Sequence, residues 1–188
     1  MEEESVDGLL KRVLEGETDA FAVVIRAYQQ RIHAYCYWML GDREESEDAV
    51  QEIMFKAYRS LHAYRYDHSF ASWLYAIAAN HCRSLLRRRH RWSLLMPLLG
   101  NRSEERSAEA VYGSSERNQL ERLQGLSVKE KEVLILRVFE DRSFEEIGSI
   151  LGLRPAAARK RFERLRNKLK EQWEQKEETA HGRRFEYQ

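Results

Sequence analysis

Two groups of basic side chains stand out in this sequence, because each could neutralise the phosphates of a nucleic acid. The first lies in residues 83–91, which contain no acid, and consists of Arg83, Arg87, Arg88, Arg89 and Arg91. The second lies in residues 154–170, where Glu163 is the one acid, and consists of Arg154, Arg159, Lys160, Arg161, Arg164, Arg166, Lys168 and Lys170. The net charge is only +1, because residues 1–19 are rich in Asp and Glu. Two separate basic groups on a near-neutral chain indicate two separate contacts with a polyanion.

The patterns typical of enzymes are missing from the sequence. Its 6 histidines follow no metal-binding spacing, and it has neither a glycine-rich phosphate loop nor a nucleophile elbow. We therefore expect no catalytic residue, metal, cofactor or small-molecule substrate. Cys36 and Cys82 are far apart in the sequence. We expect two reduced, half-buried thiols, and a disulfide or a metal-binding pair is the alternative.

The composition predicts an all-α protein. Only 9 glycines and 2 prolines interrupt 188 residues, and 34% of the residues are charged. No apolar run approaches the roughly 20 residues that span a bilayer. The acidic start of the chain is unlike a signal peptide, so we expect a cytoplasmic protein.

Apolar residues at steps of three and four predict four helices in the first half of the chain. The first covers about 6–14. The second runs from an N-cap at Thr18 to a stop at Gly41, and the third starts at Asp42, with Glu45 completing an acid variant of the capping box. The fourth is capped by Ser69 and ends in the arginine cluster. Its expected inward face is Phe70, Trp73, Leu74, Ile77, Ala78 and Leu85.

The loss of periodicity after this helix predicts two domains. We expect a first domain over 1–91, a flexible linker over 92–115, a second domain over 116–174 and a polar tail over 175–188. The linker begins with an apolar stretch, Trp92 to Leu99, which should dock on its own domain or on a partner.

A helix-turn-helix is the clearest feature of the second domain. Ser127 with Glu130 and Ser143 with Glu146 form two capping boxes, and Pro155 suits the first position of a last helix that runs to about Trp173. Small side chains at Gly148 and Ala157 would let two helices approach. The last helix is cationic and therefore suited to a DNA major groove. The alternative is an ordinary solvated face.

Three segments, in their order along the chain, resemble the sigma factors of the sigma-70 superfamily. Residues 48–58 resemble the family's second conserved region, residues 70–80 the adjacent promoter-reading segment, and residues 126–169 the fourth region. No further domain separates them, as in the extracytoplasmic-function (ECF) group. The resemblance implies a transcription initiation factor with a four-helix promoter-melting domain and a helix-turn-helix domain joined by a flexible linker.

The resemblance also implies roles for individual residues. Contact with the beta-prime clamp of core RNA polymerase falls to Asp48, Gln51, Glu52 and Phe55. Contact with the −10 promoter element falls to Tyr64, Tyr66, Phe70, Trp73, Asn80, Arg83, Arg87 and Arg88. Contact with the −35 element falls to Arg154, Ala157, Arg159, Lys160, Arg161 and Arg164. Two alternatives stay open: the acidic stretch around Asp48 is an ordinary solvated face, and Trp73 packs in the core.

The last helix departs from the family pattern. The common Thr-Val-Lys-Ser-Arg core is replaced here by Ala157-Ala158-Arg159-Lys160-Arg161, so two hydroxyls are lost and an arginine is gained. The resemblance therefore implies the mode of groove binding but leaves the preferred DNA sequence open.

The expected partners are core RNA polymerase, through its beta-prime clamp and beta flap, promoter DNA, and an anti-sigma factor, often membrane-bound, that would hold the chain inactive. The free chain should be a monomer. Two other classes stay open. One is a dimeric repressor or activator with an N-terminal sensing domain, which would bind its operator without polymerase. The other is an enzyme, although the sequence contains no catalytic motif.

Overall fold

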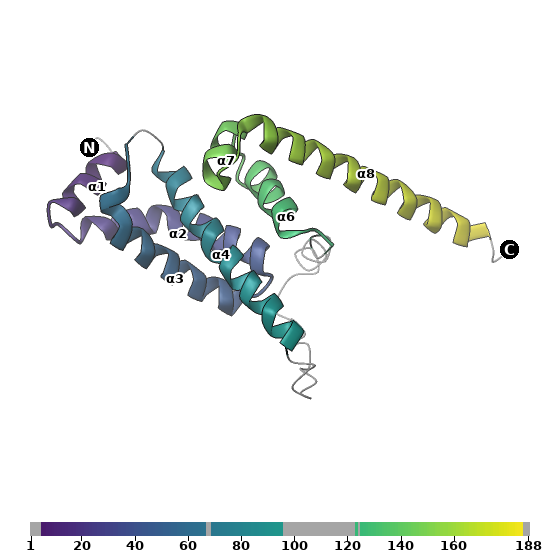
Figure 1. Ribbon diagram of the computed structural model, residues 1–188, viewed down its shortest axis with the longest axis horizontal. Coiled ribbons are helices and arrows are strands. Elements are labelled where there is room, and N and C mark those ends of the chain that lie inside the picture. The colour runs from purple at the N-terminus through teal and green to yellow at the C-terminus, as the bar shows by residue number, and fades with distance from the viewer. Residues whose placement is uncertain (1–4, 67–68, 96–122, 124, 186–188) are drawn as a thin grey trace.

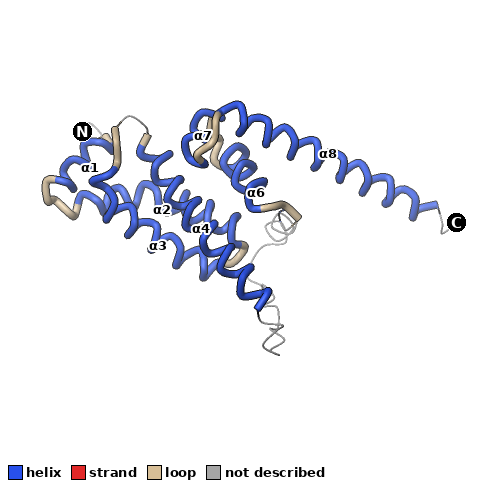
Figure 2. The backbone as a smooth tube through the Cα atoms, viewed as in Figure 1, coloured by secondary structure: helices blue, strands red, loops and turns tan. Residues whose placement is uncertain are grey.

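The computed structural model describes residues 5–66, 69–95, 123 and 125–185, with the side chains of 173 and 175–185 outside the description. All regular structure in these ranges is helical (Figure 2), as the composition predicted. Most of the expected linker, residues 96–115, lies outside the described residues. We call residues 5–95 the N-terminal unit and residues 123–185 the C-terminal unit.

The N-terminal unit is a bundle of α1 (Val6–Leu14), α2 (Ala20–Leu40), α3 (Arg43–Ser60) and α4 (Phe70–Leu95), with a 3-10 turn η1 (Leu61–Ala63) after α3. The expected caps form. Asp42 accepts a 2.8 Å hydrogen bond from the Glu45 amide, and Gly41 ends α2 at φ 71°. Ser69 accepts a 3.2 Å bond from the Ser72 amide. Thr18 is not the N-cap of α2, because that position belongs to Asp19, whose side chain makes no capping bond.

The C-terminal unit consists of α6 (Val128–Leu134), a π-helical turn η3 (Ile135–Phe139), α7 (Phe144–Leu151) and α8 (Pro155–Phe185). Both predicted capping boxes, at Ser127 and Ser143, are complete. Two expected helix ends were too early. The last helix continues past Trp173 to Phe185, and α4 continues to Leu95, so the first residues of the expected linker are helical.

The crossing of α7 and α8 depends on a glycine. A Cβ at position 148 would lie 2.7 Å from the Leu153 carbonyl oxygen, so a larger residue would push on the backbone. Of the two small residues predicted at this crossing, Gly148 is confirmed. Ala157 is exposed, and its neighbour Ala158 is the buried alanine, because the helix presents that position to α7.

The two units pack against each other. The helix α7 lies beside α4 and α6 lies against α2, while α8 runs away towards the C-terminus (Figure 1). One continuous core includes Tyr35 and Tyr75 from the N-terminal unit and Val133, Leu136 and Ile147 from the C-terminal unit. The helix α4 is therefore covered on two faces, which explains why Tyr75 is buried outside the single stripe that the periodicity predicted.

The cysteines meet in this core. Cys36 on α2 and Cys82 on α4 are free thiols, and both are fully buried, more deeply than the half-buried state expected. Within the described ranges, no helix is long and apolar enough to cross a membrane.

Candidate nucleic-acid and protein-docking interfaces

One face of α3 carries an exposed stripe of mixed chemistry. Asp48, Gln51, Glu52 and Phe55 follow one another at steps of three and four, so they lie on the same side of the helix, and all are exposed. The Phe55 ring is 56% exposed and is covered on one side by the Arg59 guanidinium, 5.6 Å from its centroid. One side of α3 thus presents two carboxylates, an amide and an exposed aromatic ring together.

A groove runs beside this stripe, between α2 and α3. It has a volume of about 440 Å³ and is lined by Gln29, Gln30, His33, Glu47, Val50 and Gln51. The three lining residues from α2 were not expected. They could have been found only as polar positions on the outer face of α2, a signal that every amphipathic helix carries.

Four aromatic rings gather around the loop before α4. Tyr64 lies 5.5 Å from Phe70 and 5.4 Å from Trp73, centroid to centroid, and 5.0 Å from Tyr66. Tyr64 and Phe70 are buried and Trp73 packs against the core, whereas Tyr66 is 44% exposed. Burial and the nearby Asp7 carboxylate raise the pKa of Tyr64 to about 12. Of the rings expected to stack a base, Tyr66 is thus the accessible one.

The polar residues of α4 divide into free and engaged groups. Asn80, Arg87 and Arg88 are exposed. Arg89 is engaged, since it donates to the Leu40 carbonyl at 3.0 Å and pairs with Glu45. The Arg83 Nε lies 2.9 Å from a carboxylate oxygen of Glu132 on α6. The structure therefore brings a predicted −10 contact against the C-terminal unit.

Between α3 and α4, Lys56 and His81 form a polar contact that the sequence did not indicate. The Lys56 Nζ lies 2.6 Å from the His81 Nδ1. Burial and the Lys56 charge lower the pKa of His81. The neutral form of the histidine next to Asn80 is therefore favoured.

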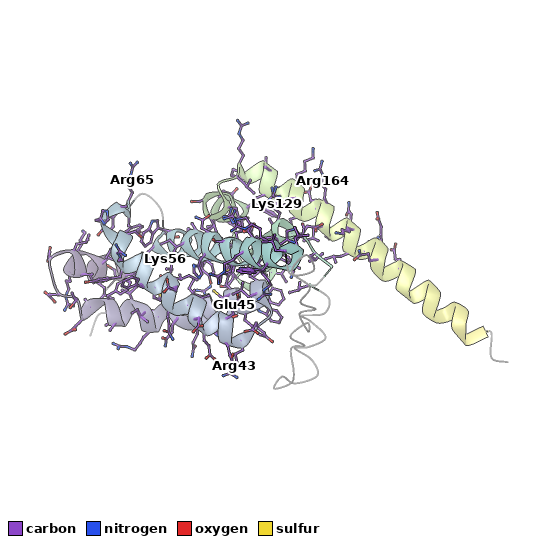
Figure 3. All side chains as sticks on the ribbon, turned by 60° about the horizontal axis from the view of Figure 1, so that its bottom comes forward. Arg43, Glu45, Lys56, Arg65, Lys129 and Arg164 are labelled. Atoms are coloured by element: carbon purple, nitrogen blue, oxygen red, sulfur yellow. The ribbon has the colours of Figure 1, made fainter. Side chains whose placement is uncertain are left out.

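The first turns of α8 present a cationic face. Ala157, Lys160, Arg161 and Arg164 follow at steps of three and four, and Arg154 lies in the preceding turn; all but the half-buried Arg161 are exposed. Arg159 points elsewhere, over the Phe144 ring at 5.1 Å. Figure 3 shows Arg164 and Arg65 extending from the same side of the molecule, although they belong to different units.

Both halves of the chain match family models. Residues 24–92 match Sigma-70 region 2, and residues 119–169 match Sigma-70, region 4. The RNA polymerase sigma factor CarQ of Myxococcus xanthus is 32% identical, over 86% of this chain and 94% of CarQ. The ECF RNA polymerase sigma factor SigW of Bacillus subtilis is 28% identical, over 87% of this chain and 94% of SigW. The sigma factor RpoE from Bartonella quintana, solved with the anti-sigma factor NepR, is similar with a TM-score of 0.66 and 25% identity, over 80% of this chain and 94% of that one.

Proposed function

Because the chain belongs to the extracytoplasmic-function group of the sigma-70 family, we propose that it binds core RNA polymerase, recognises particular promoters and opens them to start transcription. One combination carries this proposal: a single chain presents the mixed acid, amide and phenylalanine stripe on α3 and exposed cations on both α4 and α8. Sigma factors do no chemistry of their own, so these side chains need only bind and position. The chain would act in the cytoplasm, where polymerase works.

The α3 stripe would dock on the beta-prime clamp. Asp48 and Glu52 suit arginines of a partner helix, Gln51 adds an amide, and the exposed Phe55 ring supplies apolar area. The groove beside the stripe widens this surface to the outer face of α2, so a side chain of the clamp could enter between the two helices.

The −10 surface would combine one stacking ring with several polar groups. Tyr66 is exposed enough to stack an unpaired base, while Tyr64, Phe70 and Trp73 hold it in place from the core. Asn80 can hydrogen-bond a base edge, and Arg87 and Arg88 can hold phosphates. The buried rings thus have a supporting part, and Arg83 joins this surface only when it leaves Glu132.

The −35 surface would be the cationic face of α8. Lys160, Arg161 and Arg164, with Ala157 between them, face outward and can enter a major groove, and Arg154 extends that face from the turn. Arg159 would need to leave the Phe144 ring to reach DNA. The beta flap would contact the same unit, and the linker would let core polymerase hold both units on separate DNA elements.

An inhibitor is the second expected partner. RpoE of Bartonella quintana was solved with an anti-sigma factor, and we propose a comparable partner here, anchored in the membrane. The exposed end of α4 offers it a surface. Trp92, Leu94 and Leu95 are more than half exposed, so they do not dock on their own unit. The neighbouring Arg87 and Arg91 would favour an acidic partner there.

Run-off transcription tests the function directly. Purified chain is added to core RNA polymerase with the upstream DNA of its own operon, alongside Asp48→Arg and a matched charge reversal outside the stripe, Glu15→Arg. We expect transcript with the wild type and with Glu15→Arg, and a loss of at least about tenfold with Asp48→Arg. Without transcript, tight binding of the free chain to duplex DNA would instead identify a conventional repressor or activator.

A further inference from the structure

The packing of the two units brings an acid onto an expected DNA contact. Arg83 lies on α4 at steps of three and four from Asn80 and Arg87, which places it on the same stripe as these exposed groups. Its Nε is 2.9 Å from Glu132 of α6, and the Glu132 side chain is only 3% exposed. The Glu132 carboxylate therefore supplies Arg83 with the anionic oxygen that a DNA phosphate would otherwise offer.

Arg83 and Glu132 form an ion pair without a well-aligned hydrogen bond. The Arg83 Nε donates its hydrogen bond to the Ala79 carbonyl at 3.2 Å, so the nearby Glu132 oxygen is left with an ion pair but no aligned hydrogen bond. Burial raises the pKa of Glu132 even though Arg83 opposes the shift. A buried carboxylate that lacks hydrogen bonds is costly, and much of that cost disappears when the group reaches water.

A second acid of the C-terminal unit repeats the pattern. Glu140, with a side chain 6% exposed, accepts a hydrogen bond from the Tyr75 hydroxyl and lies 3.4 Å from the Arg31 Nη2. Next to it, Phe139 stacks on Trp38 with centroids 4.8 Å apart. Acids of one unit thus face cations of the other at two places, while rings cover the edge of the contact.

Buried apolar surface stabilises the contact between the units, and buried polar groups without hydrogen bonds destabilise it. The Tyr35 hydroxyl, which interacts electrostatically with Glu132, is fully buried without a hydrogen-bond partner. Buried ion pairs contribute little net stability once their desolvation is counted. Interfaces between domains of one chain are commonly of this kind and open readily. The closed arrangement should therefore be reversible.

We propose that this contact is an autoinhibitory latch, in which Glu132 occupies Arg83 in place of a DNA phosphate and the two units must separate before α4 can bind the promoter. This inference rests on the proposed function, because it takes Arg83 as a DNA contact. The latch keeps the free chain from binding DNA alone. Polymerase, by holding the units apart, releases Arg83 and exposes the stripe that it shares with Asn80.

The distance between the units can be measured in the free chain. The native cysteines are buried, so cysteines introduced as Asp19→Cys and Asn167→Cys at exposed positions would be labelled selectively for energy transfer. Into this doubly labelled chain we would introduce Glu132→Arg, which places a positive charge next to Arg83. The control is Glu171→Arg, which reverses the charge of an exposed residue on α8. We expect Glu132→Arg alone to lower the transfer efficiency and to tighten binding of forked promoter DNA by roughly tenfold.

Exchanging the charges tests the specific pair. Arg83→Glu combined with Glu132→Arg should restore the wild-type transfer efficiency, although DNA binding stays weak because Arg83 itself is gone. Should Glu132→Arg unfold the chain, as circular dichroism would reveal, Glu140→Arg in the turn before α7 should open the units instead. If the transfer efficiency is unchanged in folded Glu132→Arg and Glu140→Arg variants, these acids do not hold the units together and the latch is overturned. If the units separate but DNA binding is not tighter, the contact does not inhibit DNA binding. Neither readout needs polymerase, so failure of the proposed function would appear separately in run-off transcription.

Discussion

The Sγ atoms of Cys36 and Cys82 lie 3.8 Å apart in the core, although the residues come from different helices and are 46 positions apart in the sequence. That distance is a thiol contact and far exceeds a disulfide bond length. The neighbouring thiol and burial both raise the pKa of Cys36 strongly. Because the thiolate is the reactive form, we expect both thiols to be unreactive in the folded chain.

We therefore expect neither thiol to react with a thiol reagent such as DTNB in the native state, and both to react once the chain is unfolded in guanidinium. Counting released chromophore before and after unfolding checks this. Rapid native labelling would contradict the burial of the pair.

Gly148→Ala should destabilise the C-terminal unit. The new Cβ would meet the Leu153 carbonyl oxygen at 2.7 Å, and this backbone atom cannot move without disturbing the turn. We expect a loss of about 1–3 kcal/mol, the usual range for overpacking. Urea unfolding of the full chain measures it. Ser149→Ala, an exposed neighbour on the same helix, should cost almost nothing, and equal stability of the two variants would contradict the tight crossing.

Arg164→Ala should weaken binding to the −35 element. Arg164 is exposed on the same face of α8 as Lys160, whereas Arg166 points to the other side of the helix. If Arg164 contacts a phosphate, its loss should also reduce the salt dependence of binding by about one counterion. Titration of holoenzyme on promoter DNA at several salt concentrations gives both quantities. Arg166→Ala is the control, and a larger effect there would place the DNA on another face.

Closure of the two units should respond to pH through Glu132. Its pKa is raised in the closed chain, mainly by burial, so the closed state binds a proton more tightly than the open state. Closure is therefore strengthened as pH falls towards the ordinary glutamate value of 4.5 and weakened as pH rises through the raised value. The groups facing Glu132 are Arg83, Arg161, Lys129 and the Tyr35 hydroxyl.

Energy transfer between the two units, followed from pH 7 downward, measures this response. We expect the efficiency to rise in the wild type and to stay nearly constant in Glu132→Gln, which cannot titrate. A slope that persists in Glu132→Gln would belong to other titratable groups and would contradict the part given to Glu132.

Local signals in the sequence predicted most of the secondary structure. Ser127, Ser143 and Asp42 begin helices where expected, and Gly41 ends one, because caps depend on hydrogen bonds within three or four residues. Helix ends without such a signal were missed. Nothing between Arg91 and Leu95, or just after Trp173, stops a helix, so α4 and α8 both continue past the expected end, and α4 ends two residues before Pro97.

The candidate surfaces were predicted to different extents. The stripe from Asp48 to Phe55 and the cations of α8 could be recognised because they recur at helical spacing on one element. The loop aromatics could not be sorted in this way. Whether Tyr64 or Tyr66 faces solvent depends on how the loop folds onto α1 and α4, which no spacing within the loop encodes.

The sequence alone was sufficient for the all-α fold, the family resemblance and the two cationic surfaces, since each depends on residues close together in the chain. The pairing of Arg83 with Glu132, the meeting of Cys36 with Cys82 and the second buried face of α4 depend on residues at least 46 positions apart in the sequence. Such contacts arise only when helices pack, because apolar faces that look alike in the sequence can be covered by water, by a partner or by another part of the same chain.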